Sequence, residues 1–399
     1  MGEWKEVQLR NVSSDISYGY TASAADENVG PKFLRITDIT SGRINWETVP
    51  FCKISERDLP KYKLGVGDIV IARTGATTGY NAIIKNQINA VYASYLIRFQ
   101  IDKKLADPFF IGYVLQSNIF QDYVDAIAGG SAQPGANAQQ FADFEFSLPS
   151  IPEQQSIASI LSSLDDKIDL LHRQNKTLEQ LAETLFRQWF VEETDEEWEK
   201  QSLGNLIELD RGISYRGDLL GEKGTGMPMH NLGSIDINGS YKFEGIKYYT
   251  GEVKEKQKLN AGDLLIINTD ITQDNRIIGW PIFVPSIFIE STFTHHLYVA
   301  KLKTSSVSKF YLYFLLRYRD YRDALASNAN GTTVSMLSKE AIYNIEIKIP
   351  PKNKREQFEM IANKILDKQT INQNQIRTLT QLRDTLLPKL MSGEVRLGS

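Results

Sequence analysis

The sequence is poor in the residues that build disulfides and metal sites. Its 399 residues include one cysteine, Cys52, and four histidines, His172, His230, His295 and His296. A single cysteine excludes an internal disulfide and a cysteine-based zinc site. His295 and His296 are neighbours in a strand-like pattern, where adjacent side chains point to opposite faces, so a metal ion shared by the two is not expected.

Long apolar runs and targeting patterns are also missing. No apolar stretch reaches the ~18 residues of a membrane span, and no secretory signal pattern opens the chain. We therefore expect a cytoplasmic protein that does not contact membranes. A chain of this length is too long for one ordinary hydrophobic core, so two or more domains are expected.

The motifs of independent enzymes are absent as well. The sequence has no P-loop, no G-x-G-x-x-G between a strand and a helix, and no H-E-x-x-H. Asp68 and Asp263 each follow a glycine at matched positions, and such a pair can be catalytic, but an aspartate there more often forms a turn. The sequence predicts a chain that is not an enzyme and binds no cofactor or metal itself.

Two stretches with an apolar residue at nearly every seventh position organise the chain. Such a repeat predicts helices packed along a seam, although an amphipathic helix can also be one wall of a globular core. The second seam position is expected at Ile160, Leu181, Ile361 and Leu382. The expected interface residues are Ile157, Leu164, Leu171, Leu178 and Leu185 in the first stretch, and Ile361, Ile365, Asn372, Leu379 and Leu386 in the second.

Charge favours pairing between these two stretches. Residues 151–195 carry a net negative charge and residues 351–399 a net positive one. Opposite charge and equal spacing predict that the helices pair with each other and run antiparallel. Polar residues at or beside the seam, such as Lys167, Gln174 and Asn372, either fix the register or mark where other subunits dock.

The rest of the chain is duplicated too. Lys63–Asp68 recurs as Lys258–Asp263, and each leads into an aliphatic strand, while Ile213–Tyr215 echoes Ile16–Tyr18. A repeat near 200 residues is a duplicated domain and not a solenoid. The predicted fold class is α+β, with two mixed α/β domains, 1–150 and 196–350, each followed by a long helix, 151–195 and 351–399.

Local patterns predict the elements of each copy. The first copy should contain strands near 69–72, 92–99 and 144–149 and a helix over 109–128, broken by Gly129–Pro134. The second should contain a strand at 264–266, a helix over 310–326 and a strand at 345–350. The loops Arg73–Thr78 and Asn268–Gln273 differ most, which is typical of two modules that bind two ligands, or of neutral loop drift.

These features together resemble the specificity subunits of type I restriction–modification systems. The resemblance rests on the two matched turn–strand motifs, the Gly-Gly-Ser-Ala-Gln-Pro loop at 129–134, the Leu148–Gln155 segment that opens the first long helix, and the C-terminal run Thr385–Val395. The second copy departs from the pattern. It has an insertion before Glu356-Gln357, and its loop at 330–334 lacks Gln-Pro.

The resemblance implies two target-recognition domains that each read one half of a bipartite sequence in double-stranded DNA. An antiparallel coiled coil would fix their separation, and a helix of this length, ~57 Å, can span about one DNA turn. Two methyltransferase subunits and restriction/translocase subunits would join the chain. S-adenosylmethionine, ATP and Mg would be bound by those partners.

Candidate DNA contacts follow from chemistry. Arginine pairs well with guanine, and asparagine or glutamine with adenine, whereas lysine commonly holds phosphate. The candidates for base contact are Arg35, Arg73, Thr74, Thr77 and Gln133 in the first domain, and Arg216, His230, Asn231, Asn268, Thr269, Arg276 and Thr332 in the second. The candidates for phosphate contact are Lys61, Lys63, Lys256 and Lys258.

Two other functions remain open on the sequence. One is a scaffold that presents two protein-binding modules on a coiled coil, and the other is a DNA-modifying enzyme whose motif is not recognisable. Near-neutral domains predict weak DNA binding by the chain alone. Binding to duplex DNA with and without methyltransferase subunits discriminates between the three.

Overall fold

The computed structural model describes residues 4–40, 44–128, 135–236, 241–270, 275–331 and 334–396. The chain divides into two compact units, one of Met1–Leu170 with Gln375–Ser399 and one of Leu171–Asn374. Each unit therefore combines one globular part with pieces of both long helices. This division differs from the sequence-based one, which treats the helices as segments of their own.

The first unit is built on a four-stranded antiparallel sheet in the order β2–β7–β4–β5. All four residues of β4 are buried, because alternate side chains enter two different cores. Ile69 and Ile71 pack on the helical side, and Val70 and Ala72 pack on the other. The predicted aliphatic strand is confirmed, and its continuous apolar run reflects burial on both faces. The strands are β2 Ser13–Tyr18, β7 Leu96–Ile101, β4 Ile69–Ala72 and β5 Asn81–Ile83.

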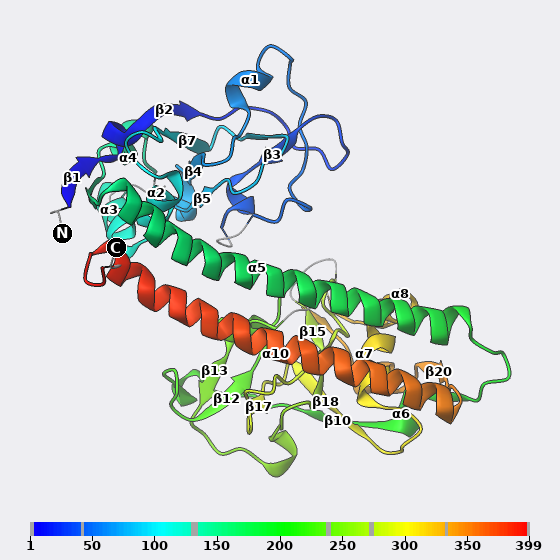
Figure 1. Cartoon of the computed structure of the whole chain (residues 1–399). Coiled ribbons are helices and arrows are strands. Elements are labelled where there is room, and N and C mark those ends of the chain that lie inside the picture. The colour runs from blue at the N-terminus through cyan, green and yellow to red at the C-terminus, as the bar shows by residue number, and fades with distance from the viewer. Residues whose placement is uncertain are drawn as a thin grey trace. The chain divides into compact units, whose positions relative to one another are not determined.

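Shorter elements surround this sheet (Figure 1). The predicted helix over 109–128 is two helices, because the chain turns at Leu115–Ser117, where the Ser117 hydroxyl donates to the Val114 carbonyl at 2.6 Å. The predicted strand 92–99 is likewise split by a turn at Ser94–Tyr95. The elements are the antiparallel pair β1 Lys5–Gln8 and β8 Glu145–Leu148, the parallel pair β3 Lys32–Leu34 and β6 Ala90–Tyr92, and helices α1 Leu59–Tyr62, α2 Pro108–Val114, α3 Asn118–Ala128 and α4 Ala138–Ala142.

The second unit repeats the same plan. Its main sheet has the antiparallel order β10–β18–β14–β16, and a strand pair β9–β20 corresponds to β1–β8. A parallel pair, β12–β17, corresponds to β3–β6 and is extended by β13 and β11. The strands are β9 Lys200–Ser202, β10 Ile207–Arg211, β11 Leu220–Gly221, β12 Met227–His230, β13 Lys247–Tyr249, β14 Leu264–Ile267, β15 Thr269–Asp270, β16 Pro281–Phe283, β17 Thr292–Phe293, β18 Leu297–Leu302, β19 Ser335–Met336 and β20 Glu346–Lys348.

Helices complete the second unit. The predicted helix 310–326 is again broken, here at Tyr318, which caps one helix and precedes the next. The Arg317 guanidinium holds this region to the long helix through carboxylates of Glu179 at 3.1 Å and Glu183 at 2.8 Å. The helices are α6 Leu203–Leu206, α7 Lys309–Arg317, α8 Arg319–Ser327 and α9 Lys339–Tyr343.

The turn that precedes β4 and the turn that precedes β14 are closed by the same hydrogen bond. The carboxylate of Asp68 accepts from the Gly65 backbone N–H at 2.9 Å, and that of Asp263 accepts from the Asn260 N–H at 2.8 Å. Both aspartates therefore close turns, as their sequence context predicts.

The structural match also corrects one part of the predicted alignment. Gly19 and Gly212 occupy equivalent places, since their N–H groups donate to Leu96 O and Leu297 O at 3.2 and 3.4 Å. A Cβ on either glycine would lie within 2.3 Å of a backbone oxygen, so only glycine fits. Tyr18 therefore corresponds to Arg211, and the predicted echo of Ile16–Tyr18 at Ile213–Tyr215 is wrong.

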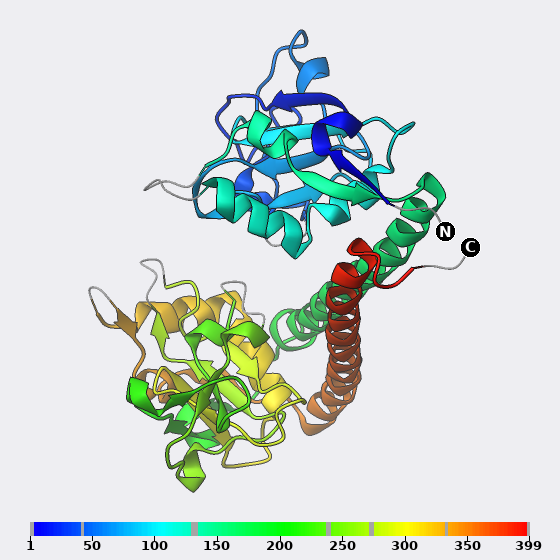
Figure 2. The same ribbon diagram turned by 90° about the vertical axis from the view of Figure 1, so that its left-hand side faces the viewer.

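The two long helices are continuous and paired. Helix α5 spans Ile151–Arg187 and leads into a short π-helix, Gln188–Glu192, while α10 spans Lys352–Met391. In the first unit the start of α5 lies with the end of α10, and in the second unit the end of α5 lies with the start of α10 (Figures 1 and 2). The pair is thus antiparallel. No helix in the described part of the chain has the length and apolar character required to cross a bilayer.

The expected interface residues lie between the two long helices. The second buried position of each heptad, however, is one residue later in the sequence than predicted. Each expected interface residue is buried or half-buried. Leu181 and Leu382, in contrast, are 48% and 45% exposed, whereas Leu161 and Ala182 beside the predicted positions are fully buried. The prediction of Leu181 and Leu382 as seam residues is therefore wrong.

Asn372 is a polar residue inside this seam. Its side chain is fully buried, and its Nδ2 donates to Asn175 Oδ1 at 2.8 Å. The neighbouring Gln369 donates to the Asn175 carbonyl at 3.1 Å and to Glu179 at 2.9 Å. Asn372 is buried and Asn175 is half-buried, and a shift of one helix along the other would break their hydrogen bond, so the pair favours one register.

Candidate nucleic-acid interface

In the first unit, Arg73 lies where β4 ends and is held from two directions. Its Nε donates to the Ser94 carbonyl at 3.2 Å, and its guanidinium lies 5.2 Å from the ring centre of Tyr18. The backbone of Arg73 pairs with Tyr95 and with Ala136, which follows the predicted 129–134 loop. These contacts fix the side chain, and within the described residues no hydrogen bond or ion pair reaches its Nη atoms.

Three exposed tyrosines lie near Arg73 in the fold: the ring of Tyr18 is in contact with it, and Tyr95 and Tyr80 pair through their backbones with Arg73 and Ala72. Tyr18, Tyr80 and Tyr95 are each more than two-fifths exposed. Tyr95 belongs to the same turn as Ser94, and Tyr80 ends the loop that begins at Arg73. An anchored arginine among exposed tyrosines offers a hydrogen-bonding fork and flat apolar surface, which suits contact with nucleic acid.

In the second unit, Asn268 takes the place of Arg73 in the fold. Its backbone N–H donates to His296 O at 3.0 Å, and its Nδ2 donates to the His295 carbonyl at 3.1 Å. Its Oδ1 accepts from Thr269, so the amide is satisfied internally. Asn268 and Thr269 are both buried. Neither can reach a base in this conformation, contrary to the sequence-based expectation.

An arginine nevertheless reaches the same carbonyl in the second unit. Arg211 stands in the place of Tyr18, and its Nε donates to the His295 carbonyl at 3.1 Å. Arg211 is exposed, and no described residue forms a hydrogen bond or ion pair with its Nη atoms. The two units thus present an arginine at the same point of the fold from different strands.

Basic side chains lie near His296. The pKa of His296 is lowered from its ordinary value, first by burial and then by its basic neighbours His295, Arg211 and Lys247. The Lys247 ammonium donates to the Tyr215 hydroxyl at 2.5 Å. The positive potential at this place favours an anionic ligand.

The two adjacent histidines do not point to opposite faces. They lie in the turn between β17 and β18, and their ring centres are 3.9 Å apart. The prediction that placed them in a strand is wrong, because the strand begins only at Leu297. Among the described residues, no group of three or more His, Cys, Asp or Glu side chains is arranged to hold a metal ion.

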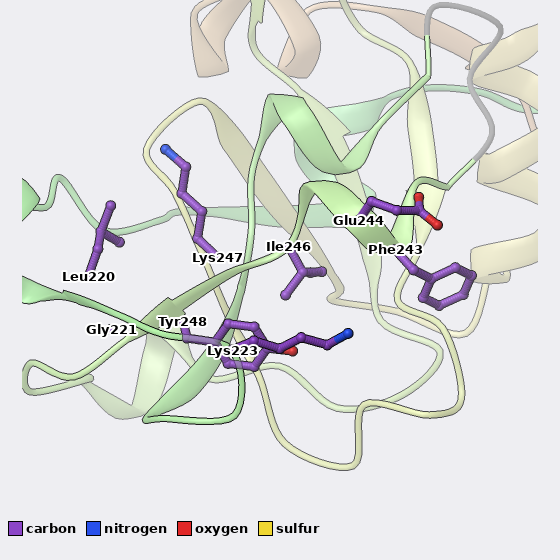
Figure 3. A pocket seen from close by; sticks show the side chains of 8 residues that line it. All are labelled: Leu220, Gly221, Lys223, Phe243, Glu244, Ile246, Lys247 and Tyr248. Carbon is purple, nitrogen blue, oxygen red and sulfur yellow. The ribbon is translucent and has the colours of Figure 1, made fainter. Parts of the chain in front are cut away.

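Lys247 also lines a pocket of about 280 Å³ on the same unit (Figure 3). The pocket lies between β11, β13 and the Phe243–Gly245 turn, and Lys223, Glu244 and Lys247 supply charged groups to its lining. Its full lining is Leu220, Gly221, Lys223, Phe243, Glu244, Ile246, Lys247 and Tyr248.

The other candidate DNA contacts of the first unit differ from Arg73 in burial and in hydrogen-bond partners. The Arg35 guanidinium already pairs in two-pronged fashion with Asp38, through Nε and Nη2 at 3.0 Å each, so its fork is occupied. Lys61 and Lys63 are exposed at the end of α1. Thr74 and Thr77 are half-buried in the loop after β4. Gln133 lies outside the described residues.

His230 and Asn231 are internal in the second unit. The His230 ring nitrogens lie 2.9 Å from Ser291 Oγ and 2.6 Å from the Tyr241 hydroxyl, and burial lowers its pKa to about 3. Asn231 is buried, accepts from the Gly233 N–H at 2.7 Å and donates to the Gly245 carbonyl at 2.7 Å. Both residues support the fold, and neither reaches the surface as expected from the sequence.

The remaining described candidates lie at or near the surface, and most of them contact other residues of the chain. Arg216 is largely exposed and pairs with Asp218 at 2.7 Å. Lys258 pairs with Glu255 at 2.9 Å, whereas Lys256 is exposed. Arg276 is exposed, and its carbonyl accepts from Arg322. Thr332 lies outside the described residues.

The buried His230 predicts a pH dependence of stability. In the unfolded chain a histidine binds a proton below about pH 6.5, whereas His230 in the folded chain binds one only near pH 3. Folding stability should therefore fall as the pH drops below about 6.5, by roughly 2–3 kcal/mol at pH 4.5 relative to pH 7. Urea unfolding of the wild type and of His230→Gln at both values measures it.

The variant should lose less stability between these two pH values than the wild type. His172→Gln is the matched control, because His172 is exposed on α5 and its loss should leave the wild-type slope intact. Equal pH slopes for the wild type and His230→Gln would contradict the assignment.

The residues that sequence reasoning missed are Tyr18, Tyr95, Arg211, Lys247, His295 and His296. Of these residues only Arg211 could have been found from the sequence, because an alignment of Gly19 with Gly212 places Arg211 at the position of Tyr18. The others depend on turns and strand pairings that bring distant segments together.

Comparison with known proteins agrees with this architecture. The family model described as "Type I restriction modification DNA specificity domain" matches residues 1–180 and 195–383. The MjaIX specificity subunit of a type I restriction enzyme from Methanocaldococcus jannaschii is 27% identical over 352 residues, covering 82% of this chain and 78% of that protein. The HindI specificity subunit from Haemophilus influenzae is 24% identical over 468 residues, covering 99% and 100%.

A solved structure shares the fold. The S subunit of a type I restriction–modification system from M. genitalium superposes with a TM-score of 0.61 at 16% identity, covering 97% of this chain and 96% of that one. The family match takes in both copies of the duplication and nearly all of the chain. This chain therefore belongs to the family of type I restriction–modification specificity subunits.

Proposed function

We propose that this chain reads a bipartite sequence in double-stranded DNA, one half-site with each unit, and directs partner subunits to it. The observation that carries the proposal is the matched place at the end of β4 and β14. The backbone there is arranged alike in both units, and the carbonyl of Ser94 in one and of His295 in the other accepts a side-chain hydrogen bond. The side chains there differ, with Tyr18 beside Arg73 and the His295–His296 turn beside Arg211.

Within this proposal the residues that contact DNA are some of those expected from the sequence, together with two that were not expected, Arg211 and Lys247. Arg73 and the exposed Lys61 and Lys63 serve the first unit. Arg211, Lys247 and the exposed Lys256 serve the second. His230, Asn231, Asn268 and Thr269 are left out because they are buried.

The chain itself acts without catalysis in this account. Two methyltransferase subunits, with restriction/translocase subunits, supply the chemistry and bind S-adenosylmethionine, ATP and Mg. The long helices offer surface for such partners, since Leu170 and Leu382 are exposed on the first unit and Leu181, Met360 and Ile371 on the second. Large apolar side chains left outside the helix seam are typical of a surface that another protein covers.

Binding to duplex DNA tests the proposal against its rivals. The purified chain should bind weakly and transfer no methyl group, and adding candidate methyltransferase subunits should produce tight, sequence-dependent binding and adenine methylation. A protein-binding scaffold would show no sequence-dependent DNA binding in either case. Methylation by the chain alone, free of partner, would show that it is an enzyme.

A further inference from the structure

The two units deliver an arginine to one equivalent carbonyl from different strands. In the first unit the arginine is Arg73 at the end of β4, and in the second it is Arg211 at the end of β10. The Nε–O distances are 3.2 Å to Ser94 and 3.1 Å to His295. Both carbonyls belong to the residue two places before the start of the next strand, β7 or β18.

The two positions carry different residues in the two units. Where the first unit has Arg73 over the ring of Tyr18, the second has Asn268 and Arg211. The Asn268 amide donates to the His295 carbonyl as the Arg73 Nε donates to the Ser94 carbonyl. The Asn268 side chain is buried and does not extend to the surface. Arg211 then supplies the guanidinium that this unit lacks at the position of Arg73.

Anchoring through Nε has a chemical consequence. It fixes the plane of the guanidinium and leaves the two Nη groups as a fork, and no described residue occupies that fork in either unit. A planar fork of two donors matches the O6 and N7 acceptors of guanine. Arg216 differs because its Nη2 already pairs with Asp218.

We propose that Arg211 is the base-reading arginine of the second unit and recognises a guanine edge in its half-site, as Arg73 does in the first. This rests on the proposed function, because it assigns a specificity residue to a half-site. The His295–His296 turn lies beside Arg211, whose Nε donates to the His295 carbonyl at 3.1 Å.

The experiment compares methylated motifs in cells. The full chain, as wild type, Arg211→Ala, Arg211→Lys or Arg319→Ala, is expressed with its methyltransferase subunits, and methylated adenines are mapped across the genome. Arg319 is the matched control, since it is an exposed arginine of the same unit whose only ion pair within the described residues is with Asp323, one helical turn away. The Arg319→Ala motif should equal that of the wild type.

Arg211→Ala should lose preference for guanine at one position of one half-site, by about tenfold or more, with the other half-site unchanged. Arg211→Lys keeps the charge but loses the planar fork, so it should relax the same position and decides the matter if the alanine variant does not fold. An unchanged motif overturns the inference, and so does a uniform loss at all sites, which would mark a phosphate contact. A wild-type chain that directs no bipartite motif would instead overturn the proposed function itself.

Discussion

Exchanging residues 1–150 for the equivalent segment of a relative with a different target is expected to replace one half of the methylated motif and leave the other half intact. The reason is that each unit has its own buried cores and its own candidate contact residues. The expected result is a change in which bases are recognised, because every base of one half-site changes. Mapping of methylated adenines with the exchanged chain measures it.

The structure specifies how such an exchange must be made. The core of the first unit includes Ile157 and Leu161 from α5 and Leu390 from α10, which remain in the recipient. The donor segment must therefore keep apolar residues at Phe110 and Phe146, which belong to the same core. The matched control exchanges residues 196–350, which should replace the opposite half. A change of both halves in either chimera would contradict independent reading.

Adding seven residues to each long helix at the border between the units is expected to lengthen the spacer between the half-sites. The insertions follow Leu170 in α5 and Asn374 in α10, where both helices pass from one unit into the other. Seven residues are one heptad, so the seam is preserved, and the added length is ~10.5 Å, or about three base pairs. The base sequences of the half-sites should not change.

The control for this experiment is the same insertion in α5 alone. It would offset α5 against α10 on one side of the insertion, so the seam could not stay paired in both units and the variant should lose stability. Thermal unfolding distinguishes the two variants. A double insertion that folds, supports methylation and keeps the wild-type spacer would show that the helices do not set the distance.

Periodic features of the fold were predictable from the sequence. The seven-residue spacing identified α5 and α10, and the matched turns before β4 and β14 identified the duplication. The second seam was misplaced because Leu181 is more apolar than Ala182. The smaller side chain faces the core where Phe186, Phe190 and Phe358 crowd together, with ring centres 5.1–5.8 Å apart.

The candidate contact residues were less predictable. His230 and Asn268 were predicted as contacts because they are polar. In the fold His230 pairs with Ser291 and Tyr241, and Asn268 pairs with the His295 carbonyl. These partners are not adjacent in sequence, so the pairs could not be predicted from it. Arg73 was predicted as a contact because it lies in a loop that differs between the copies. Arg211 was missed because strand β10 had to be aligned through Gly212 before its match with Tyr18 could be seen.

The central claim is that one chain reads two separate half-sites and that partners carry out the chemistry. The most direct measurement is the genome-wide map of methylated adenines in a host that expresses the chain with its methyltransferase subunits, compared with the same host lacking only this chain. The account predicts a single motif of two fixed halves around an unspecified spacer, which disappears when the chain is absent. Methylation that persists without the chain, or that follows one undivided motif, would contradict it.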